Sequence, residues 1–227
     1  MTAIVGESGC GKSTVVNLLI GAYRPKAGIV AVGGKLLESV TRESYYSHIA
    51  SVSYNTYIFN DSVRANFSLA KQNVSDEEIW AALEKVNLAG FIKENGGLDK
   101  VITEDANNVS GGQKQRLALA VNLVADKDIY IFDEATSNID IESEAIIMRN
   151  IKAMSKDKSV IVISHRLANV VPADNIYFME EGEVKENGSH AELMAKNGGY
   201  AKLFNTQKEL EEGYKDVARI MAKEVRA

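Results

Sequence analysis

One short segment near the start of the chain limits the possible folds more than any other. A small apolar run at residues 3–5 leads directly into the sequence Gly-Glu-Ser-Gly-Cys-Gly-Lys-Ser-Thr, and apolar residues at helical spacing follow it. This segment fits the pattern G-x-x-x-x-G-K-[ST], which forms a phosphate-binding loop between a strand and a helix. The residues that we expect to form the loop are Gly6, Glu7, Ser8, Gly9, Cys10, Gly11, Lys12, Ser13 and Thr14.

The residue types in this loop suit a nucleoside triphosphate. Its glycines let the backbone curl so that successive N–H groups point at phosphate oxygens, and the following helix adds its positive N-terminal end. Lys12 is expected to reach the β- and γ-phosphates, and the hydroxyl of Ser13 is expected to ligate Mg²⁺. The alternative is a glycine-rich turn without a ligand, and the strand-turn-helix context argues against it.

Along the rest of the chain, short β-branched runs alternate with longer helical patterns. The expected strands are residues 3–5, 29–32, 49–52, 129–132, 160–163 and 176–179. The expected helices are residues 13–19, 111–125, 141–154 and 189–196. Several of the strands are apolar on both faces, as in a parallel sheet that helices cover on both sides. The pattern predicts an α/β fold with a mostly parallel sheet.

The composition excludes several other classes of protein. The chain has 227 residues, of which 45% are hydrophobic, and this content excludes a disordered chain. The single cysteine excludes a disulfide framework. A formal net charge of −5 argues against binding along a phosphate backbone, so we expect no nucleic-acid partner. The longest nearly apolar stretch, residues 117–125, is too short to cross a bilayer.

The middle and the end of the chain break the alternation. Between residues 62 and 108 we find no convincing strand, and Ser75 followed by three acidic residues predicts a helix start. We interpret residues 60–119 as a helical subdomain inserted into a core formed by residues 1–59 and 120–205; the alternative is one long helical crossover of the same domain. Residues 206–227 predict an amphipathic helical extension that packs on its own domain. Its apolar positions are Leu210, Tyr214, Val217 and Met221.

Two adjacent acids follow the apolar run 129–132. A phosphate loop of this kind requires a carboxylate at a strand end, and Asp133 is the candidate ligand of Mg²⁺, directly or through water. Glu134 is then placed to orient or deprotonate the attacking water, so it is the candidate catalytic residue. The alternative is that the two acids only cap the next helix.

Further motifs, in the same order, resemble those of the ATP-binding cassette (ABC) ATPases. Residues 109–116, Val-Ser-Gly-Gly-Gln-Lys-Gln-Arg, are similar to the signature motif of that family, and residues 133–140 are similar to its Walker B segment and D-loop. His165 and its neighbours resemble the switch histidine. The stretches 59–66 and 181–193 look most like the exporter branch, in which the cassette is commonly fused behind a membrane domain. The resemblance implies a RecA-like ATPase core with the signature on the helical subdomain.

The resemblance also implies how the site is assembled. ATP is held between the phosphate loop of one cassette and the signature of a second, identical or different, cassette in a head-to-tail dimer. The signature residues expected to hold ATP are Ser110, Gly111, Gly112 and Gln113. They offer a hydroxyl and unobstructed N–H groups at a helix start. His165 is expected to contact the γ-phosphate and to hold the water and Glu134 in register. The implied partners are that second cassette and a transmembrane domain, at the cytoplasmic face of the cell membrane.

The sequence departs from the family pattern at three places. Tyr54, followed by Asn55, stands where such cassettes usually carry a glutamine that ligates Mg²⁺, which predicts weaker Mg²⁺ coordination or altered coupling. Residues 103–106 retain only Glu104 of the segment that usually precedes the signature. The strands that family members carry upstream, with an aromatic residue that stacks on adenine, do not precede Gly6, and we expect the chain to be a fragment of a longer polypeptide.

Three other functions compete with that of an ABC transporter ATPase. A regulatory cassette of a heterodimeric transporter that hydrolyses ATP slowly is suggested by Tyr54, whereas the presence of Glu134 and His165 argues against it. A cassette for DNA repair or translation would carry long insertions or a tandem copy, and neither is visible. An unrelated nucleotide kinase would leave the signature residues unexplained.

Overall fold

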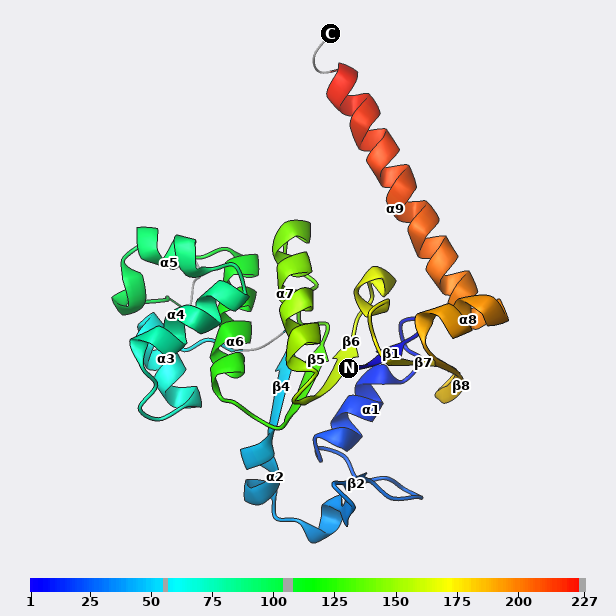
Figure 1. Ribbon diagram of the computed structural model, residues 1–227, viewed down its shortest axis with the longest axis horizontal. Helices are drawn as coiled ribbons and strands as arrows, with labels where there is room; N and C mark the ends of the chain where they lie inside the picture. Colours follow the sequence, from blue (N-terminus) through cyan, green and yellow to red (C-terminus); the bar gives the residue numbers. More distant parts are fainter. Residues whose placement is uncertain (55–56, 104–107, 225–227) are drawn as a thin grey trace.

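A computed structural model describes residues 1–54, 57–103 and 108–224 of the chain, with the side chains of residue 212 and of residues beyond 213 left out. Its centre is a six-stranded sheet (Figure 1). In spatial order the strands are β4 (Ile49–Ser53), β5 (Ile129–Asp133), β6 (Ser159–Ile163), β1 (Thr2–Val5), β7 (Asn175–Glu180) and β8 (Glu183–Gly188). Neighbouring strands are parallel except for β8, which pairs antiparallel with β7. The expected α/β fold with a mostly parallel sheet is confirmed.

Helices cover both faces of this sheet. On one face lie α1 (Lys12–Leu19) and α2 (Arg42–His48), and on the other lie α6 (Gly111–Val124) and α7 (Ile141–Met154). Side chains alternate along each strand, so both faces must be apolar. In β5, Tyr130 and Phe132 join the cluster beneath α6 and α7, whereas Ile131 joins the cluster beneath α1 and α2.

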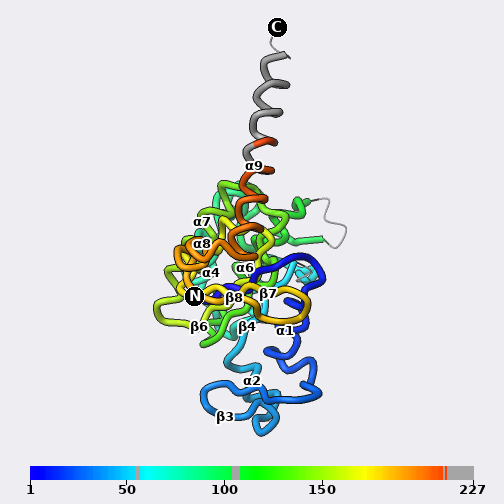
Figure 2. Tube along the Cα trace, turned by 90° about the vertical axis from the view of Figure 1, so that its right-hand side faces the viewer, coloured from blue at the N-terminus to red at the C-terminus, as the bar shows by residue number. Residues whose placement is uncertain are grey.

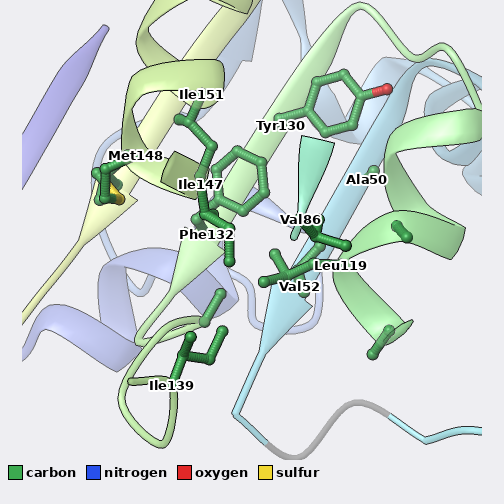
Figure 3. Close-up of a cluster of buried hydrophobic side chains, with 14 of the residues drawn as sticks. Ala50, Val52, Val86, Leu119, Tyr130, Phe132, Ile139, Ile147, Met148 and Ile151 are labelled. Atoms are coloured by element: carbon green, nitrogen blue, oxygen red, sulfur yellow. The ribbon is translucent and has the colours of Figure 1, made fainter. Parts of the chain in front are cut away.

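The cluster beneath α6 and α7 is the larger of the two, and it fixes the position of the carboxyl end of β5. The rings of Tyr130 and Phe132 are stacked with centroids 5.9 Å apart, and α7 contributes Ile147 and Ile151 beside them (Figure 3). Leu119 of α6 packs on the β4 side of the same cluster (Figure 3). All of these side chains except that of Phe132 are less than 2% exposed, so α6 and α7 are both anchored to β5. This packing holds in place the acids that follow the strand.

Helices occupy the segment between β4 and β5. They are α3 (Val63–Ala70), α4 (Asp76–Lys85), α5 (Ala89–Glu94), the short 3-10 helix η2 (Gly97–Asp99) and α6. The predicted start of α4 is confirmed, because the Ser75 side chain accepts a hydrogen bond from the N–H of Glu78 and the Glu78 side chain accepts one from that of Ser75. The apolar side chains of these helices belong to the same buried cluster as the sheet. The division at residues 119 and 120 falls within α6, and the division into subdomains stays a prediction.

One expected strand is corrected. Of residues 29–32, only β2 (Ala31–Val32) is a strand, and it pairs with β3 (Lys35–Leu36) in a separate two-stranded antiparallel sheet. Gly33 and Gly34 both have positive φ, as a tight hairpin turn requires, so the chain reverses there instead of joining the main sheet. Ile29 is 73% exposed. The short 3-10 helix η1 (Leu37–Ser39) leads from this hairpin to α2.

The chain ends in two helices after β8. They are α8 (His190–Lys196) and α9 (Gly199–Glu224), and α9 and the β2–β3 hairpin lie at opposite ends of the molecule (Figure 2). Tyr200 and Ala201 are buried, so the beginning of α9 packs on the domain. Leu210 is 58% exposed, which contradicts the expectation that this position packs inward, and the other three apolar positions lie outside the described side chains. Among the described residues, no helix has both the length and the apolar character that a bilayer crossing needs.

Candidate functional site

The expected site residues follow neighbouring parallel strands at one edge of the sheet. Asp133, the last residue of β5, pairs in register with Ser53 of β4 and with Ile163 of β6. Ile163 in turn pairs with Ile4 of β1. Because carboxyl ends of parallel strands meet at the same edge, the residues after β4, β5, β6 and β1 are brought together there. This edge is where ligands bind in open α/β sheets.

The phosphate loop joins β1 to α1, as predicted. Gly6 has φ of 151°, and a Cβ atom there would lie 2.1 Å from the carbonyl oxygen of Met179, so only glycine fits. Gly11 has φ of 103° and precedes α1 without any side-chain cap. The first N–H groups of a helix have no partner within the helix, and here no side chain caps them. The loop therefore offers N–H groups to an anion.

Lys12 is held inside the loop. Its side chain is only 5% exposed, and Nζ donates hydrogen bonds to the carbonyl oxygens of Gly6 at 2.9 Å and Glu7 at 2.8 Å. Cys10 Sγ lies 3.8 Å from the same nitrogen. Within the described part of the chain, Lys12 makes no ion pair with a carboxylate. A nearly buried cation that makes no direct ion pair with a described carboxylate fits a site for phosphate groups.

The two acids after β5 lie within the electrostatic reach of this loop. Burial raises the pKa of Asp133 above its ordinary value, and the negative charge of Glu134 raises it further. Lys12 and His165 act on the same pKa in the opposite direction. These four side chains therefore converge on one small region. A bound cation would favour the ionised form of Asp133, which is the form that ligates metal.

Glu134 and His165 contact each other directly. His165 Nε2 lies 2.5 Å from Glu134 Oε1, and both side chains remain partly exposed. Glu134 has φ of 54°, in the left-handed region, and its N–H donates to the carbonyl oxygen of Ile163 at 2.9 Å. Such a conformation costs about 1–3 kcal/mol in a residue other than glycine and is found at functional sites. The backbone turn thus aims the Glu134 carboxylate at the loop that follows β6.

The signature residues form the start of α6. Ser110 Oγ accepts a hydrogen bond from the N–H of Gln113 at 3.2 Å, and Gln113 Oε1 accepts one from the N–H of Ser110 at 2.7 Å. Because Oγ acts here as an acceptor, the Ser110 hydroxyl hydrogen can still be donated to a ligand. Ser110 and Gly111 are exposed, and a Cβ atom at Gly111 would meet nothing within 4 Å. At Gly112 a Cβ atom would lie 2.9 Å from the carbonyl oxygen of Asn138, so that glycine permits close packing.

Sequence reasoning missed Gln115, which connects α6 to the segment that follows β5. Gln115 is 6% exposed, its Nε2 donates to the carbonyl oxygen of Glu134 at 3.4 Å, and its Oε1 accepts from the N–H of Asn138 at 3.3 Å. The one available signal was a polar residue in line with the buried positions Ala118 and Leu119 of the same helix. A polar side chain on the buried face of a helix indicates that the side chain makes specific hydrogen bonds there.

Tyr54, at the position after β4, is 55% exposed. Together with Tyr57, Lys114, Gln115 and Asn138 it lines a cleft of about 260 Å³ between the end of β4 and the start of α6. Lys114 Nζ lies 6.0 Å from the centroid of the Tyr57 ring, within the range of a cation–π contact. Asn55 and residues 104–106, on which two of the expectations depend, lie outside the described residues.

The residues present fit Mg²⁺ bound together with phosphate. In the described ranges no three His, Cys, Asp or Glu residues gather in a way that could hold a metal ion by themselves. Mg²⁺ is usually held by one or two protein ligands plus substrate phosphates and water, and not by a cage of side chains. Ser13 at the start of α1 and Asp133 at the end of β5 offer a hydroxyl and a carboxylate oxygen that suit this kind of site.

Comparisons with known proteins identify the family of the chain. A family model described as ABC transporter matches residues 1–137. An uncharacterized ABC transporter ATP-binding protein of Haemophilus influenzae is 47% identical over 212 residues, which cover 93% of this chain and 38% of that protein. An ATP-dependent lipid A-core flippase of Mannheimia succiniciproducens is 41% identical over 207 residues, which cover 90% of this chain and 35% of that protein.

A solved structure shares the fold. A bacterial Atm1-family ABC exporter with ATP bound superposes with a TM-score of 0.85 at 34% identity, covering 91% of this chain and 36% of that one. The chain thus spans little more than a third of the length of the relatives that it matches. The family model covers more than half of the chain and includes the phosphate loop and both acids. The chain therefore belongs to the ABC transporter family, in which it forms an ATP-binding ATPase domain.

Proposed function

We propose that the chain binds ATP with Mg²⁺ and hydrolyses it to drive transport by an exporter-type ABC transporter. The observation that carries this proposal is the contact of Glu134 with His165, at the sheet edge that also holds Asp133 and the nearly buried Lys12. A carboxylate that is held by a histidine beside a phosphate loop is placed to act on water that attacks the γ-phosphate.

Each side chain has a distinct task in this proposal. The phosphate-loop residues Gly6 to Thr14 bind the triphosphate, and Lys12 exchanges its carbonyl partners for phosphate oxygens. Ser13 and Asp133 hold Mg²⁺, which neutralises charge on the phosphates. Glu134 accepts a proton from the attacking water. His165 holds the Glu134 carboxylate and donates to the γ-phosphate.

The placement of the two anion sites supports a head-to-tail dimer. The phosphate loop follows β1, whereas the signature helix α6 packs on the β4 side of the sheet, and three strand spacings separate β4 from β1. At roughly 4.8 Å per spacing the separation is about 14 Å. The exposed Ser110 and Gly111 are therefore available to an ATP that a second cassette holds. Removal of the γ-phosphate by hydrolysis would remove the bridge between the cassettes.

Two relatives support a role at a membrane. One is named as a lipid A-core flippase and the other as an exporter, and both are much longer than this chain. We propose that the partner cassette, identical or different, and a transmembrane domain complete the transporter, with this domain at the cytoplasmic face of the membrane. A second candidate function is a regulatory cassette that hydrolyses ATP slowly. Tyr54 favours it, because a phenol is a poor Mg²⁺ ligand in the place of an amide.

Replacement of the proposed base tests the proposal. In single-turnover measurements, Glu134→Gln should lower the rate of ATP hydrolysis about 100-fold or more, because an amide cannot accept the proton, while ATP binding is kept. Glu142→Gln, at an exposed acid in the first turn of α7, is the matched control and should hydrolyse ATP like the parent chain. A Glu134→Gln chain that hydrolysed ATP as fast as a rapidly hydrolysing parent would exclude Glu134 as the base. Slow hydrolysis by the parent itself would favour the regulatory cassette.

A further inference from the structure

The loop that carries His165 is short and partly exposed to solvent, so its conformation depends on contacts with neighbouring elements. It lies between β6 and the 3-10 helix η3 (Leu167–Val170), and the His165 side chain is 49% exposed. Ser164 supplies local support, because its Oγ accepts from the N–H of Arg166 at 3.0 Å and donates to the carbonyl oxygen of Arg166 at 3.1 Å. These bonds shape the turn, but they do not connect it to the rest of the molecule.

A side chain from the last helix makes that connection. Gln207 of α9 donates from Nε2 to the carbonyl oxygen of His165 at 2.6 Å. Its Oε1 accepts from the N–H of Leu167 at 3.0 Å. One planar amide thus binds a carbonyl and an N–H group two residues apart, on either side of Arg166. One bond is made to the carbonyl of His165 itself and the other to the N–H two residues later, so together they fix the backbone from which the imidazole projects.

The opposite side of the loop is bound to α7 through the buried carboxylate of Glu144. That carboxylate accepts hydrogen bonds from Arg166 Nη1, from Thr136 Oγ1 at 2.8 Å and from Asn169 Nδ2 at 2.8 Å. Thr136 lies two residues after Glu134, so Glu144 joins the segment after β5 to the loop after β6. The His165 loop is therefore held between two helices, by Glu144 of α7 and by Gln207 of α9.

We propose that Gln207 is a positioning residue, which holds His165 in place against Glu134 through the backbone of the loop. This inference rests on the proposed function, in which the contact of His165 with Glu134 serves hydrolysis. Without the two hydrogen bonds the loop samples more orientations, and the contact forms in a smaller fraction of molecules. ATP binding is spared, because the phosphate loop between β1 and α1 makes no described contact with Gln207.

Two substitutions of Gln207 separate its hydrogen bonds from its packing. Gln207→Met keeps the length and the apolar stem but removes both bonds. Gln207→Glu keeps an acceptor for the Leu167 N–H and sets a carboxylate oxygen against the carbonyl oxygen of His165. Both variants should lower kcat for ATP about 5- to 10-fold and leave KM within about twofold. Asn205→Met, at an exposed amide two residues earlier on the same helix, should behave like the parent chain.

The imidazole signals give a readout that does not depend on hydrolysis. The chain has three histidines, His48, His165 and His190, so their NMR signals can be assigned with single substitutions. In both Gln207 variants the His165 signal should shift and broaden. His190 contacts α9 itself, with Nδ1 2.8 Å from the Tyr200 hydroxyl and its ring 4.8 Å from that of Phe204. An unchanged His190 signal therefore shows that α9 still packs on the domain.

The outcomes distinguish this inference from the proposed function. Parent-like kcat and an unmoved His165 signal in both variants would overturn the role of Gln207, as would joint movement of the His165 and His190 signals, which would mean a displaced helix. A slower kcat with only the His165 signal changed supports the role. If the parent chain hydrolysed no ATP, the proposed function would fail, and the His165 signal would still decide whether Gln207 orders the loop.

Discussion

At the scale of single residues, the proposed site is formed by the residues at the carboxyl ends of the strands. Glu134 turns through a left-handed conformation and meets His165, while Asp133 stays half-buried with its pKa raised by burial. Ser53 pairs with Asp133 in register, so Tyr54 and Glu134 follow neighbouring strands at the same edge. A residue at position 54 that could ligate Mg²⁺ would therefore act beside the proposed metal ligand.

Tyr54→Gln should lower the Mg²⁺ concentration that ATP hydrolysis requires. An amide oxygen is a better Mg²⁺ ligand than a phenol, so the Mg²⁺ concentration for half-maximal ATP hydrolysis should fall about threefold or more. A titration of hydrolysis rate against Mg²⁺ measures this. Tyr54→Phe is the control, since it removes the hydroxyl without adding a ligand, and it should leave the titration unchanged. The same curve for Tyr54→Gln and the parent would show that position 54 does not reach the metal.

At the scale of elements, α4 and α6 are two of the three described helices that begin with the same reciprocal cap, and they have different surroundings. Ser75 of α4 and Ser110 of α6 each accept from the N–H three residues later, and Glu78 and Gln113 each return the bond. Both helices belong to the segment between β4 and β5, but only the cap of α6 belongs to the proposed phosphate-binding face. The shared geometry makes each serine a control for the other.

Ser110→Ala and Ser75→Ala should have equal effects on stability and unequal effects on hydrolysis. Each loses one side-chain cap, which costs about 1 kcal/mol of the free energy of unfolding, measured by urea denaturation. Only Ser110→Ala also removes a hydroxyl donor to phosphate, so it alone should slow ATP hydrolysis, by at least about tenfold. Equal loss of activity in both variants would mean that Ser110 serves only as a cap.

At the scale of the whole molecule, the proposal to be tested is that two cassettes form a dimer. Three strand spacings separate β4, beside which α6 packs, from β1, which leads into the phosphate loop, and we therefore propose that the site is completed by a second cassette. Gly111 gives a way to test this without disturbing the fold. A side chain there enters open space, and an acid in the first turn of a helix is favourable to it.

Gly111→Asp should prevent ATP-dependent dimerisation. The Glu134→Gln chain should dimerise in ATP, seen as a doubled mass by light scattering, because the bridging triphosphate is not cleaved. Adding Gly111→Asp places a negative charge against the partner's γ-phosphate and should leave a monomer that still binds ATP. Gly90→Asp, at a helical glycine of α5 where a Cβ atom also meets nothing within 4 Å, is the control and should dimerise. A dimer of the Gly111→Asp chain would exclude the signature from the interface.

Features that depend on neighbouring residues could be predicted from the sequence. The strand-loop-helix context of the phosphate loop, the cap at Ser75, the helix start at Gly111 and the buried strand β5 each depend on a few consecutive side chains, and the structure places them as predicted. The role of Glu134 was predicted from its position after an apolar strand, and the family resemblance added the role of His165; the structure brings these two side chains into contact. The strand β8 was missed because most of its residues are exposed and polar, so it lacks an apolar pattern.

The sequence by itself therefore determined the class of fold and the local elements, including the loop that we propose to bind phosphate. Only the tertiary structure decided that β5, β6 and β1 are neighbours, that the hairpin at Gly33 and Gly34 leaves the main sheet, and that Gln115 and Gln207 reach the catalytic edge. The physical reason is distance along the chain. Gln207 binds the backbone 42 residues before it, and a hydrogen bond of that kind leaves no periodic pattern in the amino-acid sequence.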